Sequence, residues 1–183
     1  MPSPANDYTA RIAALHRELG VPSDYAAQRH LPLHVEADPA TLVSIGRNDA
    51  GRDIALLPAA AAAWHALHAA AARDAVTLIP LSGFRSVARQ VELIRAKLAA
   101  GQSIADILRV VAAPGHSEHH TGRALDIGAP ESTTLDESFA ATSAFQWLSA
   151  HAPTFGWHLS YPAGNPHGIA YEPWHWCWNS SPN

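Results

Sequence analysis

Apolar positions in the first part of the chain follow helical spacing in two places. Residues 1–20 carry apolar side chains at helical intervals and end at Gly20, which predicts a helix. Pro58 suits the first turn of a helix, and the Ala-rich run after it predicts a second helix through Arg73. The mixed pattern of residues 21–57 predicts a short helix, loops and an edge hairpin. Candidates for the buried faces are Ile12, Leu15 and Leu19 in the first helix, and Trp64, Leu67 and His68 in the second.

The rest of the chain alternates between short apolar runs and capped helical segments. Ser86 and Ser103 each precede an apolar stretch at helical spacing, and serine is a preferred residue at helix N-termini. Strands are predicted over residues 76–81, 124–127, 157–161 and 168–171, and a further helix over residues 136–151. This order is neither a regular strand–helix alternation nor an all-strand pattern. We therefore predict an α+β fold with helices packed on a small antiparallel sheet.

The composition is that of an ordinary globular chain of one domain. The 183 residues hold 12 Lys and Arg against 16 Asp and Glu, a net charge of −4, so charge indicates neither nucleic acid nor an anionic membrane as partner. The single cysteine, Cys177, excludes an internal disulfide framework, and no apolar run reaches the roughly 20 residues that span a bilayer. The N-terminus shows no secretory signal. We expect a cytoplasmic protein, or a periplasmic or cell-envelope protein if a signal lies upstream.

Histidine is the unusual count, with 12 in the chain and seven of them from His116 to His175. Imidazole is the commonest metal ligand and a proton carrier at neutral pH. In this region His119 precedes a predicted strand, and Asp126 lies on that strand on the same face as Ala124. A carboxylate at the centre of an apolar strand needs a partner, because burying it alone is costly. A metal that also recruits His119 is one such partner; a nearby arginine, with His119 at the surface, is the other.

The segment Tyr171–Trp176 supplies a second histidine and a second carboxylate. Residues 172 and 175 would face opposite ways on an ideal strand, but Pro173 imposes a bend or an edge position. A bend can bring Glu172 and His175 toward one point, enclosed by aromatic side chains. These are Trp174, Trp176 and Trp178. The alternative is an aromatic core patch in which the glutamate and the histidine are incidental.

Together, the two segments offer three zinc ligands and one free carboxylate. His119, Asp126 and His175 would leave a fourth position open, which is typical of catalytic zinc. Glu172 would then act as general base toward a zinc-activated water. A third segment, Ser82–Ser86, places Arg85 after a predicted strand. An arginine there can hold a carboxylate or stabilise an oxyanion, and an ordinary surface arginine is the alternative.

In this order, the three segments resemble those of the VanY-type zinc D-alanyl-D-alanine carboxypeptidases. That family (M15) belongs to the LAS group of peptidoglycan peptidases, with the D-Ala-D-Ala dipeptidases and the L,D-carboxypeptidases. The pattern of the group is S-G-[FY]-R-S, then S-x-H-x-x-G-x-A-x-D, then a late E-x-x-H. The matching positions are Ser82 through Ser86, then Ser117, His119, Gly122, Ala124 and Asp126, then Glu172 and His175. The resemblance covers roughly residues 56–178.

The resemblance implies a fold, a cofactor and a set of site residues. The fold is the LAS or hedgehog-like α+β fold, with one Zn²⁺ per chain on its antiparallel sheet. Residues 56–183 would be the zinc peptidase domain, and residues 1–55 an N-terminal helix and irregular segment packed on it as one compact unit. The implied zinc ligands are His119, Asp126 and His175, the catalytic residues are Glu172 and Arg85, and the substrate-binding residues are Arg85, Gln90, Ser117 and Tyr161.

The implied activity is removal of the C-terminal D-Ala from a peptidoglycan stem peptide or its precursor. An L,D-carboxypeptidase, a D-Ala-D-Ala dipeptidase or a stem-peptide endopeptidase would use the same site. A non-catalytic zinc module that binds peptidoglycan is the alternative from another class, and the presence of three ligands and Glu172 favours the enzyme.

The chain departs from the family pattern in two places. Residues 161–168 lack the usual lysine, and Trp176-Cys177-Trp178 stands where an aromatic residue, an arginine and a tyrosine are usual. We expect Cys177 to be a buried, inert thiol rather than a ligand. His116 and His120 are expected beside the site. The remaining histidines considered are expected to pack against other side chains or to lie at the surface: His65, His68, His151 and His158.

Overall fold

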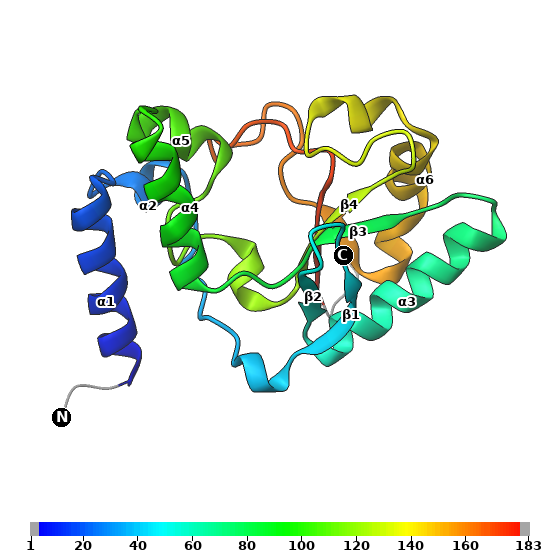
Figure 1. Ribbon diagram of the computed structural model, residues 1–183, viewed down its shortest axis with the longest axis horizontal. Helices are drawn as coiled ribbons and strands as arrows, with labels where there is room; N and C mark the ends of the chain where they lie inside the picture. Colours follow the sequence, from blue (N-terminus) through cyan, green and yellow to red (C-terminus); the bar gives the residue numbers. More distant parts are fainter. Residues whose placement is uncertain (1–3, 180–183) are drawn as a thin grey trace.

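The computed structural model describes residues 4–179, whose helices gather in two groups on either side of the strands (Figure 1). The outermost ends of the two predicted domains, residues 1–3 and 180–183, lie outside the described residues. The α-helices are α1 (Pro4–Leu19), α2 (Tyr25–Gln28), α3 (Pro58–Arg73), α4 (Val87–Ala99), α5 (Ile104–Val110) and α6 (Ser143–His151). Four 3₁₀ helices are η1 (Pro39–Thr41), η2 (Glu118–Thr121), η3 (Glu137–Ala141) and η4 (Ala152–Phe155). The strands are β1 (Val43–Arg47), β2 (Asp53–Leu56), β3 (Ile79–Ser82), β4 (Ala124–Gly128), β5 (Trp157–Leu159) and β6 (His175–Trp178).

A four-stranded antiparallel sheet forms the centre of the molecule, in the order β3-β4-β6-β5. Pro80 lies in β3, at an edge, where a missing N–H interrupts no central ladder. Side chains alternate along β4. Leu125 and Ile127 enter the main core, whereas Asp126 takes the opposite face. The sheet therefore separates an apolar face from a polar one.

The apolar face packs against α3 and α6. The alanines Ala60 and Ala61 let α3 approach closely, and Trp64 and Leu67 extend the contact. His68, a candidate for the same helical face as Trp64 and Leu67, is exposed, which agrees with its assignment to a packing or surface position. The side of α3 that carries it faces solvent, because the alanines already complete the buried stripe.

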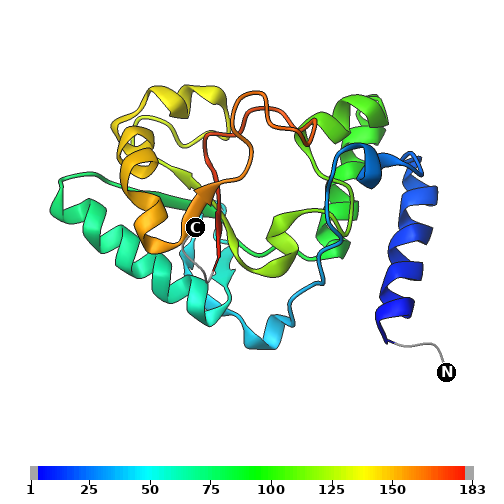
Figure 2. The same ribbon diagram turned by 180° about the vertical axis from the view of Figure 1, so that it is seen from behind.

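The other α-helices lie together on the side of the strands opposite α3 and α6 (Figure 2). Their buried residues form a second core. Leu19 of α1, Ile94 of α4 and Leu108 of α5 meet in it. The β1–β2 hairpin packs on the main core instead: Ile54 and Leu56 enter that core, and the N–H of Phe84, just after β3, donates to the carbonyl of Ala55. The α+β architecture is thus confirmed, and the division at residues 55 and 56 stays a prediction.

Most predicted elements are present, with three corrections near the C-terminus and one in the third strand. Residues 136–151 form two helices rather than one, because Thr142 is extended and its hydroxyl caps α6 by accepting from the N–H of Phe145. Residues 168–171 form no strand, and the last strand is β6. Strand β3 begins at Ile79 and β5 ends at Leu159, so both are shorter than predicted. Among residues 4–179, no helix has the length and apolar character needed to cross a membrane.

Candidate metal centre and active site

Three predicted ligands meet on the polar face of the sheet. His119 comes from η2, Asp126 from the centre of β4 and His175 from the start of β6. Asp126 and His175 lie directly opposite each other in the β4–β6 register. Each of the three residues offers one donor atom, and these atoms lie within 4.8 Å of one another. Two imidazoles and one carboxylate at this spacing fit a zinc ion with an open coordination position.

Hydrogen bonds fix which nitrogen of each histidine faces the centre. Nδ1 of His119 donates to the carbonyl of Gly83 at 2.7 Å, so Nε2 points at Asp126, 3.3 Å from its Oδ2. His175 is turned the other way round: Nδ1 lies 3.1 Å from Oδ1 of Asp126, and Nε2 lies 2.9 Å from Oε2 of Glu118. Such outer partners orient the imidazoles that bind metals.

Gly122 shapes the turn that presents His119. It adopts φ +67 at the end of η2, in the left-handed region that favours glycine. A Cβ at this position would come within 2.9 Å of a methyl group of Leu42. This motif position therefore requires glycine for both a conformational and a steric reason.

Charge at the centre is concentrated on buried groups. Burial alone would raise the pKa of Asp126, but His119 and His175 lower it well below its usual range. Burial would lower the pKa of His175, yet its hydrogen bonds to Asp126 and Glu118 raise it to about 10. Burial lowers the pKa of His119. Before a metal binds, the centre thus holds a protonated His175 between two carboxylates, and a metal would replace the Nδ1 proton.

Glu172 lies beside the three ligands without joining them. The predicted bend is present: the N–H of His175 donates to the carbonyl of Glu172 across a turn at Pro173, and Oε2 of Glu172 is 3.9 Å from Nδ1 of His175. Burial raises the pKa of Glu172 to about 7. A carboxyl group with that pKa can both take and return a proton at neutral pH.

Arg85 is held at the mouth of the centre. Its guanidinium lies 3.7 Å from Oδ2 of Asp126 and donates to Oε1 of Gln90 at 3.2 Å. Nε2 of Gln90 in turn donates to the carbonyl of Ala112 at 2.6 Å. Asp126 therefore faces both an arginine and the histidines, and the alternative that left His119 at the surface is wrong, because His119 is buried. The amide of Gln90 is engaged within the protein and positions Arg85.

A single cleft of about 550 Å³ contains every predicted site residue. These are Arg85, Gln90, Ser117, His119, Asp126, Tyr161, Glu172 and His175. Tyr161 is buried in the wall, and its carbonyl accepts from the N–H of Glu172 at 3.1 Å. Of the three tryptophans expected around the site, Trp174 lines the cleft, whereas Trp176 enters the main core and Trp178 packs against it.

Two further residues of the motif support the site: the role of Glu118 was not predicted, whereas His120 lies beside the site as expected. Glu118 orients His175, and burial, which would raise its pKa, is outweighed by His175, which lowers the pKa to about 2. His120 is fully buried, with Nδ1 donating to the carbonyl of Arg85 at 2.6 Å and Nε2 accepting from the N–H of Gly115. The position of Glu118 next to His119 in the sequence was the signal that could have indicated its role. His158 is half-buried beside Glu118 and Cys177, in a cluster that was not predicted.

These residues and their order define the class to which the chain belongs. Residues 53–181 match the family model described as VanY, D-alanyl-D-alanine carboxypeptidase. Because the match covers well over half of the chain, the protein belongs to the VanY D-alanyl-D-alanine carboxypeptidase family.

Curated relatives share about a third of their aligned residues with this chain. Over 121 residues it is 35% identical to the YodJ protein of Bacillus subtilis (strain 168), and over 117 residues it is 32% identical to the D-alanyl-D-alanine carboxypeptidase of Enterococcus faecalis (strain ATCC 700802 / V583). These alignments cover 63% and 58% of this chain. They cover 43% and 42% of the relatives, so the chain spans less than half of their length.

Solved structures with this fold come from enzymes of two specificities. The LdcB LD-carboxypeptidase, in a study of peptidoglycan recognition, is 29% identical with a TM-score of 0.68, over 80% of this chain and 71% of its own. A variant of the vancomycin-resistance D,D-pentapeptidase VanY, in complex with Zn(II), is 27% identical with a TM-score of 0.56, over 81% and 82%.

Proposed function

We propose that this protein is a zinc-dependent D,D-carboxypeptidase that removes the C-terminal D-Ala from peptidoglycan stem peptides or their precursors. One observation carries the proposal: three metal-binding side chains, a free glutamate and an arginine line the same cleft. A cleft of about 550 Å³ has the size of a small-ligand site. It suits the end of a short peptide.

Each residue has a role that its surroundings support. When bound by His119, Asp126 and His175, one zinc ion would supply Lewis acidity and a water of lowered pKa. Glu172 takes the proton of the attacking water and later returns it to the leaving amine, because its pKa of about 7 permits both transfers. Arg85 binds the substrate and polarises the scissile carbonyl, and Gln90 holds its guanidinium in place.

Ser117 and Tyr161 complete the proposed substrate pocket. Both are buried, with exposed fractions of 5%, and both line the cleft. The ring of Tyr161 also contacts that of His175 at a tilt of 39°, with 5.0 Å between the ring centroids. Tyr161 is thus part of the cleft wall beside His175 and does not act as a proton donor, since burial raises its pKa far above its usual value.

The second candidate is an L,D-carboxypeptidase with the same catalytic residues. The likeness to the LdcB LD-carboxypeptidase favours it. The two activities differ in the residue that precedes the cleaved D-Ala, so they are separated by the pocket on that side and not by the zinc chemistry. Two expectations stay predictions: that the protein binds peptidoglycan stem peptides, and that it lies in the cytoplasm or the cell envelope.

Two stem peptides test the proposal. The zinc-loaded protein is incubated with a pentapeptide ending in D-Ala-D-Ala and, separately, with the tetrapeptide that ends in a single D-Ala, and products are followed by mass spectrometry. Loss of one alanine from the pentapeptide alone supports D,D activity; cleavage of the tetrapeptide alone moves the assignment to L,D activity. A pentapeptide with an amidated C-terminus is the control, because a carboxypeptidase requires the free carboxylate. Absence of product from both peptides at full zinc occupancy contradicts both candidates.

A further inference from the structure

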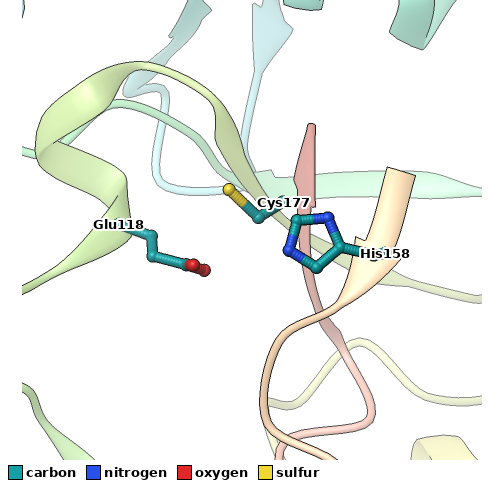
Figure 3. Close-up of side chains that lie close together, drawn as sticks. All are labelled: Glu118, His158 and Cys177. Carbon is teal, nitrogen blue, oxygen red and sulfur yellow. The ribbon is translucent and has the colours of Figure 1, made fainter. Parts of the chain in front are cut away.

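A second group of side chains of types that can bind a metal lies on the polar face of the sheet, beside the first centre. Glu118, His158 and Cys177 point toward one another from η2, β5 and β6 (Figure 3). Each offers one donor atom, a carboxylate oxygen, an imidazole nitrogen or the thiol sulfur, and these atoms lie within 4.8 Å of one another. None of the three belongs to the His119, Asp126 and His175 centre.

Strand register places two of the three residues together. His158 lies directly opposite Cys177 in the β5–β6 pairing, so their side chains emerge as neighbours on one face. Cys177 is two residues after His175 and therefore shares its face of the sheet. On the other side Cys177 pairs with Ala124, whose small side chain leaves room above the sheet.

A second cleft of about 220 Å³ opens over this group. Its lining includes Glu118, His158 and Ser160, together with His34 and His167. Cys177 does not line this cleft and is buried, with an exposed fraction of 4%, but its sulfur lies within 4.8 Å of the donor atoms of Glu118 and His158, which do line it. Solvent can therefore reach the carboxylate and the imidazole, while the sulfur is shielded.

We propose that Glu118, His158 and Cys177 form a second metal site, which takes a divalent cation of the zinc type and leaves a fourth position open to the smaller cleft. Thiolate and imidazole together select such borderline cations over magnesium or calcium. Three protein ligands with one open position satisfy the preference of zinc for four ligands.

Glu118 links the two sites. Its Oε2 accepts from Nε2 of His175 at 2.9 Å, which leaves the other carboxylate oxygen for the second cation. A cation bound there fixes Glu118 and, through it, the ring of His175. Occupancy of the second site thereby holds a ligand of the first in its binding orientation.

Binding involves the transfer of one proton and no redox change. The Cys177 S–H bond breaks, a sulfur–metal bond forms, and the proton leaves to solvent through the cleft. His158 would bind through a lone pair of its neutral imidazole.

Cobalt(II) is the probe, because a cobalt–thiolate bond gives a near-ultraviolet charge-transfer band. The full chain is loaded with Co²⁺, freed of excess ion by dialysis, and examined by absorption and by metal analysis. We expect two ions per chain and a thiolate band. Cys177→Ser should abolish the band and leave one ion; His158→Gln, on an edge strand, should lower the occupancy in the same way. His119→Ala should keep the band, since it disrupts the other centre.

His167→Gln is the matched control, since His167 lines the same cleft but is not one of the three ligands. It should retain both ions and the band. One ion per chain with no band in the wild-type protein would overturn the proposal and make Cys177 an inert buried thiol. A band that disappears in His119→Ala would also overturn it, because the thiolate would then belong to the first centre. This measurement does not involve peptide hydrolysis, so it is independent of the proposed activity.

Discussion

Replacing Asp126 with asparagine should destabilise the metal-free protein and abolish the first metal centre. Asp126 is 2% exposed and faces His119, His175 and Arg85 within 3.1–3.7 Å. Removing one partner of a buried ion pair costs about 3–5 kcal/mol, and we expect the lower end because His175 keeps Glu118. About 3 kcal/mol corresponds to a fall of roughly 6–12 °C in Tm for a chain of this size.

The assay is thermal unfolding of chelator-treated protein at pH 7, followed by zinc titration. Both are done in a Cys177→Ser background, so that only the His119, Asp126 and His175 centre is measured. Asp49→Asn, at an exposed position, removes the same charge and should change stability by less than about 0.5 kcal/mol. An Asp126→Asn protein that binds zinc as tightly as its parent would refute the assignment of Asp126 as a ligand. An unchanged Tm would refute the buried network.

Three further predictions follow from single contacts. Gly122→Ala should lower the free energy of unfolding by about 2 kcal/mol, because alanine disfavours the left-handed backbone and its Cβ would clash with Leu42. Gly164→Ala, at a similar φ but with no atom nearby, should lower it by about 1 kcal/mol. Equal denaturation midpoints for the two variants would contradict this prediction. Arg85→Lys should lower kcat/KM by about tenfold or more with zinc content unchanged, because lysine lacks the planar fork; an unchanged kcat/KM would remove Arg85 from substrate binding. His175 has a raised pKa of about 10, so its contribution to the stability of metal-free protein is complete below about pH 6.5 and is lost as pH rises through about 10. Urea unfolding across that range should show a steeper decline in wild type than in His175→Gln, and parallel curves would contradict the prediction.

Local chemistry made most of the fold predictable. Ser86 and Ser103 both cap helices as expected, each accepting a hydrogen bond from a backbone N–H in the first turn. The alternation along β4 correctly separated Asp126 from the core residues beside it. The break at Thr142 was missed because apolar residues continue on both sides of it, and only its extended backbone reveals the second cap.

The candidate site was predictable where the residues lie within one motif. The spacing of His119 and Asp126, and the bend at Pro173, both follow from rules that act over a few residues. The proximity of His158 to Cys177 depends on the β5–β6 register. The role of Glu118 depends on how η2 packs beside the sheet, within hydrogen-bond distance of His175. Neither is encoded in local spacing, which is why His158 was expected only to pack or to lie at the surface; Cys177 is buried, as expected.

The central claim is that Glu172 acts as the base in a zinc site that removes a terminal D-Ala. It is tested most directly by comparing wild type with Glu172→Gln on a stem pentapeptide, measuring alanine release and bound zinc in the same samples. The account predicts that the variant keeps the zinc of the first centre and releases alanine at least about 10²-fold more slowly. Alanine release at the wild-type rate by Glu172→Gln, at equal zinc content, would contradict it.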